Sequence, residues 1–342
     1  MDIVHFLSSH MLDPATGGKQ LYRDVIEQAV HADRLGYHGV GIPEHHLVNI
    51  LLIPSPLQMA VAVAARTQHV RLMTSICQLP LRDMRVFAGE VVQAQALCEG
   101  RLMLGVGKGA FAVETEQLGV PFAETKPRFE EALKVLEALL GGEDVSWQGQ
   151  HYQFGPLTIM PRPEDPIPLM LAVMAPPGIE GAARAGYHVQ TTPLGAGHQM
   201  LLDQVNAFHR GKAAAGPQAT NRLSLQRGVY LAKSDADARE KIALAYDYYR
   251  RFDNVFGGPG LVDRGIIRPI ERQQTMEELG ENLMICTRDE MIDRLATYAE
   301  IGIDDVISTS SFGQPQGETL EMMDRFASEV MPHITHLKKS AA

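Results

Sequence analysis

Two apolar runs separated by a helical pattern make up the stretch VRLMTSICQLPLRDMRVFAGEVVQAQALCEGRLMLGVGKG, residues 70–109. Residues 70–79 read as a strand, residues 85–100 carry apolar side chains at helical spacing, and residues 101–107 read as a second strand. Both apolar runs are short and lack a polar face, as is typical of strands buried on both sides of a sheet. A strand, a crossover helix and a second strand predict two parallel neighbours in one sheet.

The same alternation continues on both sides of this stretch. The predicted strands are residues 2–9, 37–42, 70–79, 101–107, 168–173, 187–193, 223–233 and 304–310. The predicted helices are residues 19–36, 55–68, 85–100, 126–142, 178–186, 198–216, 234–252, 288–302 and 318–334. Such a series of strand–helix units predicts the α/β class and a (β/α)8 TIM barrel that forms a single domain over residues 1–342. A doubly wound open sheet is the alternative that the pattern allows.

Two segments exceed what a minimal barrel needs. Residues 143–167 predict a small hairpin followed by a proline-rich run. Residues 253–287 are long, rich in glycine and predicted to be irregular. Long loops in compact barrels are usually functional, so we expect residues 253–287 to form a lid over the active site, with the glycines at 257–260 as its hinge.

The composition disfavours several classes of protein. The 342 residues include 41 acidic and 31 basic side chains, a formal charge of −10, which argues against nucleic acid and anionic membrane as partners. Cys77, Cys98 and Cys286 are far apart, so they predict neither a disulfide framework nor a cysteine-based metal site, and they indicate a reducing compartment. No stretch resembles a signal peptide or an apolar span of ~20 residues. We therefore expect a cytoplasmic protein.

Polar side chains follow the predicted strands, where a TIM barrel carries its active site. Ser9 and His10 follow the first strand, and Glu44, His45 and His46 follow the second. An imidazole titrates near neutral pH, so a histidine here suits proton transfer, although a histidine that only completes a hydrogen bond is the commoner case. A metal site is disfavoured, because it needs further ligands and because adjacent residues of an extended segment point to opposite sides. We predict no metal.

A phosphate site is predicted at two neighbouring strand ends. Lys108 is flanked by glycines in GVGKGA, residues 105–110, so backbone amides can approach an anion closely. The spacing is that of neither a Rossmann fingerprint nor a Walker loop. The sequence Pro-Pro-Gly at 176–178 opens a predicted helix, whose free N–H groups and dipole favour an anion. A solvated lysine beside an ordinary helix start explains the pattern equally well.

Several stretches also match a known family. LGYHGVGIPEHH, residues 35–46, and the stretch at 70–109 resemble the bacterial luciferase family of flavin-dependent monooxygenases, most closely its luciferase α-subunit type. PLMLAVMAPPGIEGAARAGY, residues 168–187, and IGIDDVI, residues 301–307, extend the resemblance over nearly the whole chain. The resemblance implies a luciferase-like TIM barrel, and a mobile loop at the position of residues 253–287.

The resemblance also implies roles for particular residues. His45 matches the family's essential histidine, which assists proton transfers around the flavin. Thr74-Ser75 matches a non-proline cis peptide beneath the flavin ring. Lys108 stands where the family commonly has an arginine on the flavin phosphate, a change that keeps the charge and loses the bidentate fork. The implied cofactor-binding residues are Thr74, Ser75, Lys108, Gly109, Met174, Ala175 and Gly178. The last three lack the carboxylate and hydroxyls that luciferases have there, so their backbone amides would have to serve. We expect Ser9, His10 and Glu44 to contact substrate.

The implied reaction is that of a two-component monooxygenase. Reduced FMN (FMNH2) from a separate flavin reductase would react with O2 to give a C4a-(hydro)peroxyflavin, which oxygenates a small organic substrate. The sequence also allows an F420- or flavin-dependent oxidoreductase of the same superfamily that transfers hydride without activating O2. It further allows a flavin-holding protein without catalysis, or a metal-dependent hydrolase on the same fold. The family implies a homodimer, with residues 56–65 as a contact.

Overall fold

Eight parallel strands close into a barrel. The structure of the protein, a computed structural model, describes residues 1–337. The barrel strands are β1 (Asp2–Phe6), β2 (Gly39–Ile42), β3 (Arg71–Thr74), β5 (Leu102–Gly107), β8 (Leu169–Ala172), β9 (His188–Thr191), β10 (Leu223–Leu231) and β14 (Asp305–Thr309). Each strand pairs in parallel with the next, and β14 pairs with both β10 and β1. The predicted TIM barrel is confirmed, and the open sheet is wrong because these strands leave no free edge.

Helices surround the barrel. They are α1 (Gly17–Leu35), α2 (Pro56–Ala64), α3 (Met84–Leu97), α4 (Ala112–Gln117), α5 (Thr125–Gly141), α6 (Pro176–Arg184), α7 (His198–Ala215), α8 (Asp235–Val255), α9 (Met276–Asn282), α10 (Arg288–Glu300), α11 (Gln316–Glu329) and α12 (Met331–Ile334). α1 stops where the sequence predicts, at Gly36, whose left-handed φ of 79° suits glycine. Among residues 1–337, no helix combines the length and the apolarity that a membrane span requires.

The predicted strand at 70–79 is interrupted. β3 ends at Thr74, and a short strand β4 (Cys77–Gln78) then pairs with β5. At Gly105, strand β5 comes so close to the end of β3 that a Cβ atom on this residue would lie 1.9 Å from the carbonyl oxygen of Thr74. A glycine is therefore required where β5 passes beneath the end of β3.

The insertion at 143–167 forms the small hairpin that the sequence predicts. β6 (Val145–Gln148) and β7 (Gln153–Leu157) pair in antiparallel fashion. Glu131 of α5 holds this hairpin by accepting hydrogen bonds from the indole N–H of Trp147 at 3.1 Å and from three backbone amides. The proline-rich run follows, as predicted.

The prediction that residues 253–287 are irregular is wrong. The segment contains β11 (Val262–Asp263), β12 (Ile266–Ile267), α9 and β13 (Met284–Cys286). α9 begins at a capping box, in which Thr275 and Glu278 exchange hydrogen bonds with each other's backbone N–H groups. β13 pairs in parallel with the end of β10, a contact with a strand more than fifty residues earlier in the chain. That tertiary contact overrides the weak local pattern.

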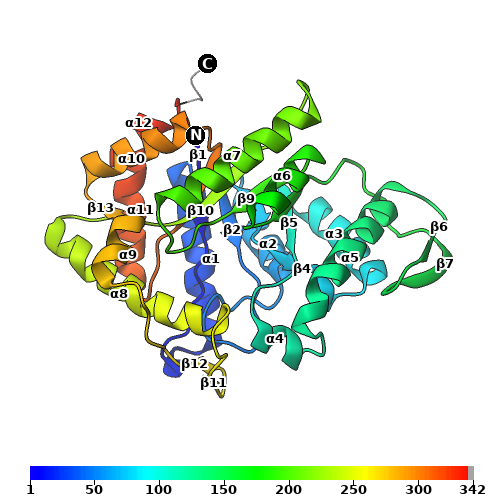
Figure 1. Ribbon diagram of the computed structural model, residues 1–342, viewed down its shortest axis with the longest axis horizontal. Helices are drawn as coiled ribbons and strands as arrows, with labels where there is room; N and C mark the ends of the chain where they lie inside the picture. The colour runs from blue at the N-terminus through cyan, green and yellow to red at the C-terminus, as the bar shows by residue number, and fades with distance from the viewer. Residues whose placement is uncertain (338–342) are drawn as a thin grey trace.

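The carboxyl half of α8 lies over the barrel mouth. Residues of the barrel strands, together with Leu51 from the loop after β2, form an inner apolar cluster that is separate from the main core: Val4, Phe6, Leu51, Met73, Met170 and Ile307. Phe252 of α8 packs against this cluster. In Figure 1 the hairpin β11–β12 and α4 lie at the lower end of the molecule, opposite the N-terminus, and α8 runs toward them. The sequence predicts an ordinary barrel helix at 234–252, whereas the structure makes this helix part of the cover.

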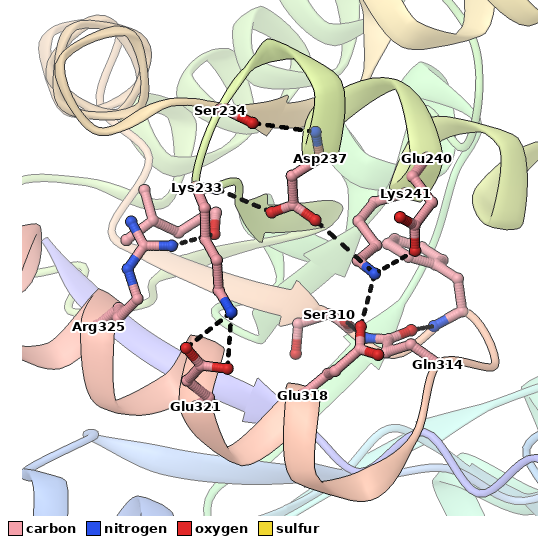
Figure 2. Close-up of polar contacts among 12 residues, drawn as sticks. Lys233, Ser234, Asp237, Glu240, Lys241, Ser310, Gln314, Glu318, Glu321 and Arg325 are labelled. Atoms are coloured by element: carbon pink, nitrogen blue, oxygen red, sulfur yellow. Dashed lines mark hydrogen bonds and ion pairs between the residues drawn. The ribbon is translucent and has the colours of Figure 1, made fainter.

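The amino half of α8 is fixed to α11. Ser234 caps the helix, and Figure 2 shows Lys241 reaching Asp237, Glu240 and Glu318. The Lys241 ammonium is almost fully buried, 2.7 Å from Glu240 and 2.6 Å from Glu318. Burial opposes its charge, but the carboxylates more than offset this and raise the pKa of Lys241. This end of α8 is therefore anchored, whereas its other end meets the mouth.

Candidate active site

His45 follows β2 and lies at the barrel mouth beside α4. Its ring stacks on Phe111, with the centroids 4.0 Å apart and the planes 17° apart. Nδ1 of His45 lies 3.1 Å from Oε2 of Glu114. Nε2 has no hydrogen-bond partner among residues 1–337, and the side chain is 13% exposed. Nε2 is therefore the nitrogen that a ligand can reach.

Glu114, on α4, holds His45 in place. Its side chain is fully buried. Its carboxylate also accepts hydrogen bonds from the backbone N–H of His46 and from Nε2 of Gln78. Burial opposes its ionisation, but the charge on His45 and these hydrogen bonds lower the pKa of Glu114 overall. An ionised Glu114 can only accept, so it holds the proton of His45 on Nδ1 in the hydrogen bond between them.

Sequence reasoning missed Glu114. It is distant from His45 in the chain, and no motif marks its position. The available signal was its place in the polar segment that follows β5, where barrel enzymes put functional side chains.

Glu44, expected to contact substrate, is instead engaged by protein groups. Its buried carboxylate lies 2.8 Å from Arg82 and 2.8 Å from Nε2 of His46. It also accepts a hydrogen bond of 3.0 Å from the backbone N–H of Gln78. In this arrangement Glu44 braces the segment that carries His45, because these partners occupy both of its oxygens.

Ser9 and His10 also follow β1, and His10 is half-buried. Ser9 is fully buried. Nε2 of His10 lies 3.1 Å from the carbonyl oxygen of Ser311, and Nδ1 accepts from the backbone N–H of Leu51 at 3.4 Å. Burial lowers the pKa of His10 to about 4, so its ring is neutral at physiological pH. His10 joins β1 to the end of β14, and neither of its nitrogens is free for substrate.

A chain of polar side chains lines the inner wall of the mouth. The Ser75 hydroxyl and the Gln190 carboxamide contact each other at 2.7 and 2.9 Å. Gln190 donates to Gln226 at 3.0 Å, and Gln226 donates to Thr309 at 3.3 Å. These residues come from four strand positions around the barrel, and the sequence did not indicate Gln190 or Gln226. The wall is polar and uncharged, which suits a ligand with amide-like donors and acceptors.

The expected cis peptide bond lies one residue later than predicted. The bond between Ser75 and Ile76 is cis, and not the bond between Thr74 and Ser75. The backbone N–H of Ser75 still donates to the carbonyl oxygen of Ile42 at 2.7 Å, so the chain remains in the sheet up to that point. The Thr74 hydroxyl binds the backbone of Gly105 in both directions at 2.8 Å, so this side chain supports β5 rather than lining the mouth.

The predicted phosphate residues lie together at the rim. β5 pairs with β8, so Lys108 and Gly109 follow one strand while Met174, Ala175 and Gly178 follow its neighbour. The Lys108 side chain is exposed, with Nζ 4.5 Å from the centroid of the Phe122 ring. Gly109 has a left-handed φ of 84°. The first two helical positions of α6 are prolines without N–H groups, so Gly178 supplies the first amide of this helix. The rim therefore offers one exposed cation, whose Nζ donates to the carbonyl oxygen of Gly109 at 3.1 Å, and few amides.

One group of side chains has the spacing of metal ligands. Asp2, His38 and Asp305 gather at the amino end of the barrel, away from the mouth. The Arg222 guanidinium joins the two carboxylates, so a protein cation already fills the space between them. Within residues 1–337 this is the one candidate metal group.

The arrangement defines a class: TIM-barrel proteins with a histidine and other polar side chains gathered at the carboxyl ends of the strands, where such barrels carry their active sites. A family model described as luciferase-like monooxygenase matches residues 1–305. The protein belongs to this family, as the sequence resemblance implied.

Two curated relatives differ in the cofactor that their names give. The chain is 28% identical over 331 residues to the oxygenase component of a flavin-dependent trigonelline monooxygenase from Acinetobacter baylyi, covering 94% of this chain and 92% of that protein. It is 27% identical over 335 residues to an F420-dependent glucose-6-phosphate dehydrogenase from Beutenbergia cavernae, covering 91% and 93%.

A solved structure has the same architecture. The crystal structure of monooxygenase RslO1 from Streptomyces bottropensis superposes with a TM-score of 0.82 and 25% identity, covering 97% of this chain and 99% of that one. The family thus includes proteins named as monooxygenases and proteins named as F420-dependent dehydrogenases.

Proposed function

We propose that the protein is a flavin-dependent monooxygenase that takes reduced FMN from a separate flavin reductase and inserts one oxygen atom of O2 into a small organic substrate. The observation that carries the proposal is the pair of His45 and Glu114 at the mouth of a luciferase-like barrel. The nearly full-length similarity to an oxygenase component supports the reductase as partner.

The residues at the mouth fit an FMN molecule. The hydroxyls of Ser8 and Ser310, at the ends of β1 and β14, are buried without a hydrogen-bond partner. Ser75, Ile76 and Gln226 stay partly exposed although they lie on the barrel wall. Lys108 and the amide of Gly178 would hold the phosphate, and the Ser75–Ile76 backbone with the polar wall would hold the ring. Bound there, reduced FMN would supply the two electrons that activate O2.

The protein groups around this site have three tasks. Nε2 of His45 accepts a proton from the reacting groups and returns it, while Glu114 keeps the proton on Nδ1 and stabilises the charged imidazole. The aromatic side chains Phe111 and Phe252, whose ring centroids are 5.5 Å apart, exclude water from the mouth. The polar wall orients the ligand through neutral hydrogen bonds.

The experiment combines the purified protein with FMN, NADH, a generic flavin reductase and a panel of candidate substrates under isotopically labelled O2. We expect product that carries one labelled oxygen atom. His45→Ala should lower product formation roughly 100-fold or more while FMN affinity changes little. Labelled product at the wild-type rate from this variant would remove His45 from the mechanism.

The second candidate is an F420-dependent oxidoreductase that transfers hydride without activating O2. The similarity to an F420-dependent dehydrogenase favours it. The same protein is mixed with F420 and a panel of alcohols and sugar phosphates, and F420 reduction is followed by absorbance. Reduction of F420 without uptake of labelled oxygen would replace the first proposal with this one. Flavin binding with neither activity would indicate a protein that only holds flavin.

We also propose that the protein acts as a homodimer, as the family resemblance implies.

A further inference from the structure

Two arginines are buried beside the carboxyl half of α8. Arg227, on β10, is 4% exposed, and the side chain of Arg272, which follows β12, is 7% exposed. Arg272 forms an ion pair with Asp253 of α8, at 2.5 Å. Arg227 has no carboxylate within ion-pair distance among residues 1–337. The region therefore holds two cations and one anion, an imbalance that is costly away from water.

The protein satisfies only part of this donor set. The terminal nitrogens of Arg227 donate to the carbonyl oxygens of Leu194, at 2.8 Å, and of Asn282. Nη2 of Arg272 donates to Gln274 at 2.7 Å. The Nε–H groups of both arginines are buried and lack an acceptor.

The Tyr249 hydroxyl adds a third unused donor. It has no hydrogen-bond partner among the described residues, and its charge interactions are with Arg227, Arg272 and Asp253. The Arg272 guanidinium lies over the Tyr249 ring, 5.3 Å from its centroid. Gly195, on the facing loop, leaves room for the guanidinium, because a Cβ atom there would lie 3.1 Å from Nη2.

A purely structural role explains some of these contacts. Arg272 ties the segment after β12 to α8, and Arg227 ties the loop after β9 to α9. This role leaves unexplained why both buried Nε–H groups lack acceptors while positive charge is in excess. The Tyr249 hydroxyl beside them is not fully buried and is also without a protein acceptor among residues 1–337. Native proteins seldom bury such donors unless a ligand or water completes them.

The donor set adjoins the candidate active site. The rings of Tyr249 and Phe252 are 6.4 Å apart, those of Phe252 and Phe111 are 5.5 Å apart, and Phe111 stacks on His45. These ring contacts form a continuous series from Tyr249, beside Arg272, to His45. Lys108, to which we assign the flavin phosphate, lies after β5, on a different part of the rim.

We propose that Arg227, Tyr249 and Arg272 form a subsite for a carboxylate, and that the substrate is a small organic acid whose apolar part lies along the α8 aromatic side chains. This inference rests on the proposed function and names its substrate class. A planar carboxylate suits guanidinium donors, and its charge restores neutrality in the buried region.

The test titrates the full chain by calorimetry, at constant ionic strength, with two carboxylates and their neutral isosteres: acetate against acetamide and benzoate against benzamide. We expect the wild type to bind each carboxylate at least about 10-fold more tightly than its amide. Arg272→Gln should abolish this preference. Tyr249→Phe, which removes only the hydroxyl, should reduce it and serves as the second variant if Arg272→Gln does not fold. Arg268→Gln is the matched control, because Arg268 lies on the same segment with its side chain 65% exposed.

If the wild type binds carboxylates and amides with equal affinity, the subsite is overturned. It is also overturned if the Arg268→Gln control loses the preference for carboxylates over amides. A flavin phosphate is the competing occupant of these donors. If Arg272→Gln lowers the affinity for FMN while leaving that for riboflavin unchanged, the donors serve the flavin and the substrate subsite is overturned. The titrations need no turnover, so a negative result overturns the carboxylate subsite without bearing on the proposed monooxygenase activity. Failure of the oxygen-insertion experiment, in turn, does not change the result of the titrations.

Discussion

At the scale of single residues, the site depends on a histidine whose two nitrogens have different surroundings. Glu114 contacts Nδ1 of His45, stacking on Phe111 fixes the plane of the ring, and Nε2 has no hydrogen-bond partner among residues 1–337. A buried carboxylate selects the tautomer of the histidine that it contacts. Because Glu114 contacts Nδ1, we expect Nε2 to be the nitrogen that exchanges protons. Glu114 is thus a positioning residue that acts through His45.

Glu114→Gln tests this role. The amide keeps the shape of the side chain but no longer favours a protonated Nδ1, so we expect kcat to fall by about 10- to 100-fold with a smaller change in KM. The pH profile of kcat should shift as well, because the charged imidazole loses its counter-ion. Steady-state rates across pH measure both effects. A change in KM alone, with an unshifted profile, would assign Glu114 a structural role only.

The same variant has a defined effect on stability. The pKa of Glu114 is lower in the folded protein than its ordinary value of 4.5. A carboxylate of this kind stabilises the fold above its unfolded pKa, and the contribution is lost as pH falls through the folded pKa. We therefore expect the difference in unfolding free energy between wild type and Glu114→Gln, measured in urea, to be largest at neutral pH and to shrink below pH 4.5. A difference that stays constant into acid contradicts the assignment.

Lys108→Ala tests the phosphate site. One partly solvated cation contributes modestly, so we expect FMN affinity to fall by about 5- to 30-fold, which corresponds to roughly 1–2 kcal/mol. Riboflavin, which lacks the phosphate, should bind the wild type and the variant equally. Flavin fluorescence titration measures both ligands. An equal loss for the two flavins would place Lys108 beside the ring and not beside the phosphate.

At the scale of elements, we propose that α8 and the hairpin β11–β12 together cover the mouth, and both are anchored to the rest of the protein. The amino half of α8 is fixed by Lys241, and the hairpin β11–β12 is fixed by two buried asparagines. Asn254 of α8 binds the backbone of Leu261 and Arg268, and Asn49 accepts a hydrogen bond of 3.0 Å from the backbone N–H of Ile267. The hairpin thus depends on side chains outside itself, because a hairpin this short is not stable alone.

Asn254→Ala should release the hairpin. The change leaves buried backbone groups of residues 261 and 268 without partners, so we expect a loss of about 1–3 kcal/mol in unfolding free energy. Hydrogen exchange over residues 261–268 should accelerate, and more O2 should be consumed per product formed as water enters the mouth. Arg268→Gln, which alters only an exposed side chain of the same hairpin, is the control. Unchanged coupling would show that the hairpin does not seal the site.

The elements that the sequence predicts are those whose pattern is local. The barrel strands and α1, with Gly36 at its end, carry their own periodicity and stop signals. β13 and the position of α8 depend on long-range contacts with β10 and with the inner cluster. For the same reason the sequence indicates His45 but not its partner Glu114, nor the wall formed by Gln190 and Gln226. The residues in each of these contacts are far apart in the sequence, so no local pattern predicts that they meet.

At the scale of the whole molecule, the barrel closes its sheet edges, and one of its outer helices, α3, leaves two large apolar side chains exposed. Val86 and Leu97 of α3 are 61% and 53% exposed. They are about three helical turns apart, so they lie on one face of the helix. α2, the predicted dimer contact, packs beside α3. Exposed apolar side chains on α3, beside the apolar helix α2, fit an interface better than a free surface.

Val86→Asp combined with Leu97→Asp should therefore dissociate a dimer. We expect the wild type to elute with a light-scattering mass near twice 37.6 kDa, and the double variant to elute near the mass of one chain with its secondary structure intact. The reason is that a carboxylate buried in an apolar interface without a partner is too costly to retain. Met160→Asp, at a side chain that is 76% exposed outside both helices, is the matched control and should leave the mass unchanged. A wild-type chain that is monomeric at micromolar concentration would contradict a dimer interface on α2 and α3. A Met160→Asp control that dissociates as the double variant does would also contradict it, because the dissociation would then not depend on Val86 and Leu97.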